Sequence, residues 1–161
     1  MESRAKILGH PIHQILVPLP LGVLTMSVVF DVIALSLSRH AALFTAAHYM
    51  LAAGVISALL AALFGLVDFL AIPAGTRAKR VAAMHGIGNV IVVLLFAASW
   101  FLRRGHPADP DTIAIALSLV AAAISGVTGW LGGELVDRLG VGVDDGAHLN
   151  APSSLSGRIA R

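Results

Sequence analysis

The chain has 161 residues, of which 57% are hydrophobic and only 12% are charged. Soluble globular domains carry about 25% charged residues, so this composition excludes an ordinary water-soluble protein. The formal net charge is +2, and the basic residues form no patterned surface that would suggest nucleic-acid binding. The chain has no cysteine, which excludes disulfides, thiolate metal sites and cysteine nucleophiles.

Four long apolar segments follow one another along the chain, and each exceeds the about 20 residues that an α-helix needs to cross a bilayer. The sequence therefore predicts an all-α integral membrane protein, a four-helix transmembrane bundle with up-down-up-down topology. A single domain, residues 1–139, holds the expected spans at 11–38, 42–72, 80–102 and 112–139. A polar, glycine-rich tail follows at 140–161, and we expect it to be flexible and cytoplasmic.

The first span opens with the sequence GHPIHQILVPLPLG, which combines two histidines with three prolines. Pro18 and Pro20 have no N–H to donate to the carbonyls four residues before them. We therefore expect a loosened first turn, with free carbonyl acceptors close to His10 and His13. Such a turn is a candidate cradle for an ion or a cofactor.

Two polar side chains interrupt the apolar spans near the side opposite the termini. Asp31 in the first span and His48 in the second fall at comparable depth. Ionisable residues inside a membrane span tend to face the bundle interior and to find partners there. The sequence predicts a polar pair of Asp31 and His48, as a buried ion pair or as a proton-accepting station.

More ligand-type side chains lie at the other ends of the spans. With a rise of about 1.5 Å per residue, all four spans bring such a group to one layer near the cytoplasmic face. We expect a metal site in this layer, built from His10, His13, Asp68 and His85. A cofactor would be held by His13 and His85, and Asn89 and Glu134 would support these ligands from outside.

Three interpretations of this layer stay open. A structural polar network, with Asp68 accepting from His85 or Asn89, would fix helix register. Haem b or a divalent metal ion would use imidazole ligands, and His13 and His85 come from different helices at similar depth, as two axial ligands require. A proton or small-solute path is the third, although four short helices leave little room for a pore. No arrangement of nucleophile and base points to independent catalytic activity.

Small residues recur at four-residue spacing in two spans, which favours close helix contact inside a membrane. Either the bundle itself or a homo-oligomer would use them. In the second span they are Gly54, Ala58, Ala62 and Gly65. In the fourth they are Ala114, Ser118, Ala122 and Gly126, continued by Gly129 and Gly133.

Basic residues beside the spans predict the orientation. The side of the termini carries Arg4, Lys6, Arg77, Lys79, Arg80 and Arg138, with Arg158 and Arg161 discounted as distant from the spans. The opposite side carries Arg39, Arg103 and Arg104. The positive-inside rule then places both termini in the cytoplasm of a multi-pass protein of the bacterial inner membrane.

Three stretches, GHPIHQILVPLPLG, GLVDFLAIPAGTRAKRVAAMHGIGN and WLGGELVDRLGVGV, together resemble the bacterial membrane family catalogued as domain of unknown function 2231, from Gly9 to Val143. The matching residues are His10, Pro11, His13, Asp68, His85, Asn89, Gly132 and Gly133. Many relatives have tyrosine and histidine where this chain has Asp137 and Leu139. The resemblance implies a four-helix inner-membrane protein. Some relatives are joined to Rieske-type iron–sulfur domains, which implies an electron-transfer setting and a redox protein partner; a non-catalytic, partner-binding subunit is the alternative.

Overall fold

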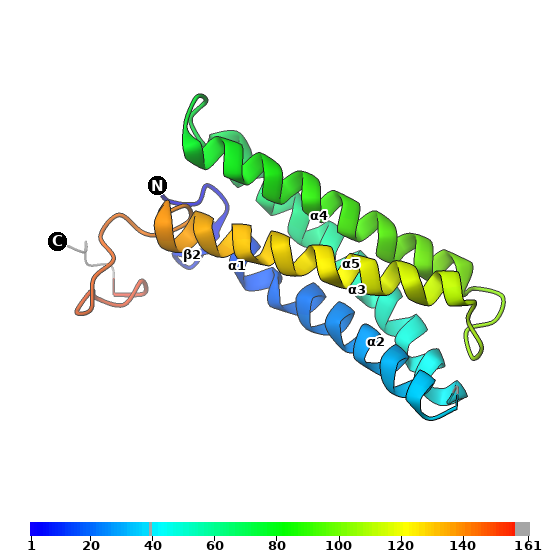
Figure 1. Ribbon diagram of the computed structural model, residues 1–161. Coiled ribbons are helices and arrows are strands. Elements are labelled where there is room, and N and C mark those ends of the chain that lie inside the picture. Colours follow the sequence, from blue (N-terminus) through cyan, green and yellow to red (C-terminus); the bar gives the residue numbers. More distant parts are fainter. Residues whose placement is uncertain (39, 157–161) are drawn as a thin grey trace.

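The structure is a computed structural model, and it describes residues 1–38 and 40–156. The chain folds into four long helices with short elements beside them (Figure 1). They are α2 (Pro18–Ser36), α3 (Ala41–Ala71), α4 (Arg77–Leu102) and α5 (Thr112–Gly133). All four are long and apolar enough to cross a membrane, so the expectation of an all-α protein with four apolar spans is confirmed. Arg39, Arg158 and Arg161, which entered the charge count, lie outside the described residues.

Short elements precede the first long helix and follow the last one in the chain. Strands β1 (Lys6–Ile7) and β2 (His10–Pro11) form an antiparallel hairpin, and its two-residue turn has positive φ angles, 51° at Leu8 and 86° at Gly9. Helix α1 (Ile12–Leu16) follows and is separated from α2 at Val17, directly before Pro18, which lacks the N–H that would continue the helix. A π-helical turn, η1 (Glu134–Arg138), extends α5.

The helices form a ring in which α2 packs on α3 and α4 packs on α5, while α3–α4 and α5–α2 contacts close the bundle. Figure 1 shows that consecutive long helices run in opposite directions and that the segment following α5 lies at the same end as the N label. We call this the terminal end and the other the loop end. Helices α2 and α4 are thus diagonal to each other.

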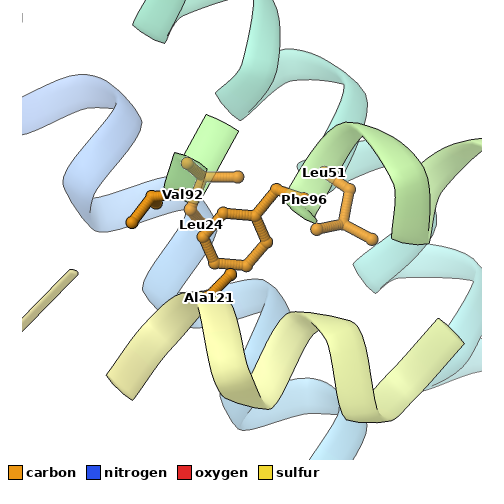
Figure 2. Packing of buried hydrophobic residues seen from close by; sticks show 5 residues of the cluster. All are labelled: Leu24, Leu51, Val92, Phe96 and Ala121. Carbon is orange, nitrogen blue, oxygen red and sulfur yellow. The ribbon is translucent and has the colours of Figure 1, made fainter. Parts of the chain in front are cut away.

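Large apolar side chains cover the outside of the bundle. In each candidate span, only between 17% and 28% of the most apolar window is buried. Inside, Leu24, Leu51, Val92 and Ala121 surround the ring of Phe96, so all four long helices contribute to one central cluster (Figure 2). The exposed apolar surface is what a bilayer requires of its proteins.

The two halves of the chain repeat one pattern of burial. The buried residues Pro20, Leu24, Ser27 and Asp31 of α2 are each 72 positions before the buried Val92, Phe96, Ser99 and Arg103. The buried residues Ala47, Leu51, Gly54 and Ala61 of α3 are each 67 positions before the buried Ala114, Ser118, Ala121 and Thr128 of α5. The bundle is therefore built as two equivalent helical hairpins, α1–α3 and α4–α5.

The stripe of small residues expected in the fourth span starts inside the bundle and winds around α5 to its exposed face. Ala114 and Ser118 are buried, whereas Gly126, Gly129 and Gly133 are exposed. A four-residue spacing rotates by about 40° per step around a helix with 3.6 residues per turn. The inward stripe continues instead through Ala121, Thr128 and Leu131.

Candidate cofactor site

His13 lies in the first turn of α1 and rests on helix α3. Its Nδ1 is 2.9 Å from the carbonyl oxygen of Ala61. A carbonyl can only accept, so Nδ1 carries a proton, and in the neutral imidazole this leaves the lone pair on Nε2. A side chain at Gly65 would place its Cβ 2.8 Å from Cε1 of this ring, so only glycine leaves the imidazole its place. Among the described residues, Nε2 of His13 has no hydrogen-bond partner.

His85 rests on helix α5 in the same way. Its Nδ1 is 2.8 Å from the carbonyl oxygen of Thr128, and a Cβ at Gly132 would lie 3.1 Å from its Cε1. Its Nε2 accepts from the side-chain amide of Asn89 at 3.0 Å, and Thr128 donates its hydroxyl to Asn89 Oδ1 at 2.9 Å. The predicted support of His85 by Asn89 thus has a direct contact.

The two histidines occupy equivalent positions of the two hairpins. They are 72 residues apart, and the carbonyls and glycines that receive them are 67 residues apart. Two further pairs with the 72-residue separation meet across the bundle: Leu24 with Phe96 in the central cluster, and Asp31 with Arg103 in an ion pair. The imidazoles of His13 and His85 are themselves close enough to interact electrostatically. Both lie toward the terminal end, His13 in α1 and His85 in the first turns of α4.

The remaining residues of the predicted layer have other partners. The Asp68 carboxylate accepts from the backbone N–H of Arg4 at 2.7 Å, and Glu134 accepts from Arg77 at 2.5 Å. His10 is exposed in β2, 3.4 Å from the Ser154 hydroxyl. In the described part of the chain, no three His, Cys, Asp or Glu side chains are grouped as a metal ion would need. The structure brings together His13, His85 and Asn89, and not the four-residue metal site.

Asp31 at the loop end pairs with Arg103 instead of His48. The guanidinium donates from Nη1 and Nη2 to the two carboxylate oxygens at 2.7 and 2.6 Å, and both side chains are 0% exposed. Ser99 and Ser118 accept further N–H groups of Arg103 at 3.2 Å. The pair lies about 27 Å along the helices from the histidine level, given a separation of 18 positions and the helical rise.

His48 lies near this pair without bonding to it. Its ring stacks on Trp100 with centroids 6.1 Å apart, and its Nδ1 is buried without a hydrogen-bond partner among the described residues. Sequence reasoning missed Arg103 because it directly follows the third span and was counted as a loop charge. The separation of 72 residues from Asp31, equal to that of the histidines, is the signal that would have found it.

Comparison with known proteins identifies the family. Residues 9–145 match the family described as "Predicted membrane protein (DUF2231)". Neither the curated proteins nor the solved structures include a match to this chain. Because the match includes both histidines, Asp31, Arg103 and all four long helices, the chain belongs to the DUF2231 family of membrane proteins.

Proposed function

We propose that the protein is a redox-linked membrane component that binds one haem b between His13 and His85. The observation that carries this proposal is the equivalence of the two histidines. Each donates Nδ1–H to a backbone carbonyl, which is the arrangement that orients an imidazole and leaves Nε2 to ligate iron. Haem held by two imidazoles supplies one-electron transfer when bound.

The donor set fits haem better than a divalent metal ion. Porphyrin nitrogens provide four ligands to the iron, so the protein has to supply only two. A protein-bound zinc ion takes three or four protein ligands, and the described residues provide no such group. In a haem-bound protein, Asn89 would release Nε2 of His85, to which it now donates.

The proposal predicts that protein purified in detergent from haem-supplied cells shows a Soret band and the sharp reduced-state bands of a bis-imidazole haem. His13→Ala and His85→Ala should each abolish that spectrum, because each removes one of the two imidazoles that would hold the iron. Absorption spectra and a haem assay on matched amounts of protein measure this.

His10→Ala and His48→Ala serve as controls, because neither imidazole belongs to the pair. A colourless wild-type protein from haem-supplied cells would reject the proposal. So would a Soret band that survives both His13→Ala and His85→Ala.

We further propose that the terminal end faces the cytoplasm of the bacterial inner membrane, with an electron-transfer partner docking there. The amino-terminal segment, the start of α4 and η1 lie at this end (Figure 1), and they carry Arg4, Lys6, Arg77, Lys79, Arg80 and Arg138. At the loop end, Arg103 is neutralised inside the bundle, which leaves Arg104 as an exposed cation among the described residues. This charge difference supports the orientation by the positive-inside rule.

The absence of native cysteine makes this orientation directly testable. Ala74→Cys places a thiol in the exposed α3–α4 loop at the terminal end, and Gly105→Cys places one in the α4–α5 loop. In intact spheroplasts, a membrane-impermeant maleimide should label the Gly105→Cys variant and leave the Ala74→Cys variant unlabelled until the cells are lysed. The reverse pattern would contradict the proposed orientation.

A further inference from the structure

We propose that Asp68 is a positioning residue, which holds His13 at its site by tethering residues 3–11 to helix α3. We call these residues the amino-terminal strap. The inference rests on the proposed function, because His13 is one of its two proposed axial ligands. It differs from the expected role of Asp68, since the carboxylate acts through the backbone of the strap and touches no imidazole.

The tether consists of several hydrogen bonds to one carboxylate. Ser3 donates its hydroxyl to the Asp68 carboxylate, whose two oxygens both lie 2.8 Å away. The backbone N–H groups of Arg4 and Ala5 donate to Oδ1 at 2.7 and 3.4 Å. Ser3 is only 6% exposed, so its contact with Asp68 is partly shielded from water. Hydrogen bonds to an ionised group are about twice as strong as neutral ones.

Backbone hydrogen bonds connect the tethered part of the strap to the residue directly before His13. Ile12 donates its N–H to the Ala5 carbonyl at 2.9 Å, and Lys6 pairs with Pro11 in the β-hairpin. His13 is the next residue after Ile12. On α3, the carbonyl and glycine that receive His13 belong to Ala61 and Gly65, and Asp68 follows one turn later on the same face.

Only one of the two histidines needs such a support. His85 follows eight residues of α4, so helical hydrogen bonds fix its backbone on both sides. His13 is the second residue of a five-residue helix that ends before Pro18. At the position equivalent to Asp68, the second hairpin has Leu135, which packs in a hydrophobic cluster. The carboxylate therefore occurs in the hairpin whose histidine lacks a preceding helix.

The test measures how well each histidine is protected in the full chain without added haem, in lipid nanodiscs. Diethyl pyrocarbonate modification of His13 and His85 is followed by mass spectrometry in wild type, Asp68→Asn and Ser3→Ala. Loss of a hydrogen bond to a charged group should raise the population of the detached strap, and with it the labelling rate of His13, about tenfold in Asp68→Asn. The rate at His85 should not change.

Glu2→Gln is the matched control. Glu2 accepts from Lys6, a contact that lowers the pKa of the Glu2 carboxyl, and it does not touch Asp68. This variant should label His13 at the wild-type rate. An unchanged His13 rate in both Asp68→Asn and Ser3→Ala would overturn the proposal.

If both histidines are labelled faster in Asp68→Asn, that substitution has loosened the bundle itself. The labelling of Ser3→Ala then decides whether the tether protects His13. An increase confined to His13 in Ser3→Ala supports the tether, and any other pattern overturns it. Because labelling is measured without haem, it stays informative if the Soret experiment rejects haem binding. In haem-loaded protein, Asp68→Asn should also convert part of the six-coordinate spectrum to a five-coordinate one.

Discussion

Replacing Asp31 with asparagine should lower the free energy of unfolding by about 3–5 kcal/mol, because it leaves the buried Arg103 guanidinium without its counter-charge. Arg103→Gln should have a similar effect for the opposite reason, since it strands a carboxylate in the same place. Reversible unfolding of the purified protein in mixed micelles, with increasing SDS, measures both changes. Arg104→Gln is the matched control, because Arg104 is exposed and lies over the Trp100 ring.

The equivalence of positions 31 and 103 allows a sharper version of this experiment. The double variant Asp31→Arg with Arg103→Asp restores opposite charges in the same place and should be more stable than either single substitution. Recovery should be partial. Ser118, which accepts from Arg103, has Leu51 as its counterpart in the first hairpin, and leucine cannot accept a hydrogen bond from an arginine at position 31. A double variant no more stable than the singles would show that the two positions are not interchangeable.

Gly54→Ala should be the most damaging of the glycine-to-alanine changes in α3, with a loss of about 1–3 kcal/mol from overpacking. An added Cβ would fall inside the contact distance of the Leu24 side chain. Leu24 cannot move aside, because Leu51, Val92, Phe96 and Ala121 enclose it in the central cluster. The same SDS titration measures this loss.

Gly126→Ala provides the control for this prediction. It makes the same chemical change in α5, where an added Cβ meets nothing within 4 Å. Its stability should stay within about 0.5 kcal/mol of the wild type. An equal loss in both variants would point to backbone conformation, and not to the α2–α3 contact, as the role of Gly54.

Segment length and hydropathy predicted the four long helices well, since a bilayer demands about 20 apolar residues in a row. The third span began three residues earlier than expected, at Arg77, because Thr76 caps the helix by accepting from the N–H of Lys79. The β-hairpin before α1 was not expected. It depends on a turn with two left-handed residues, and leucine is an uncommon residue in that conformation.

The candidate site was harder to predict, because depth along a helix says little about direction around it. His13, Asp68 and His85 were all assigned to one layer, yet Asp68 binds the amino-terminal strap, His13 binds a carbonyl of α3 and His85 binds a carbonyl of α5. Pairing by depth alone also joined Asp31 to His48. Asp31 pairs with Arg103 and not with His48, because a guanidinium donates to both carboxylate oxygens and always carries the positive charge that a buried aspartate needs.

The opposite signs of the two equivalent charges have a consequence for assembly. Two copies of the first hairpin alone would bring aspartate against aspartate in a medium of low dielectric constant, and two copies of the second would bring arginine against arginine. Both wrong dimers are repelled, whereas unlike halves attract. In a protein made of two similar halves, this one pair of side chains therefore disfavours pairing between identical halves and favours pairing between the two different ones.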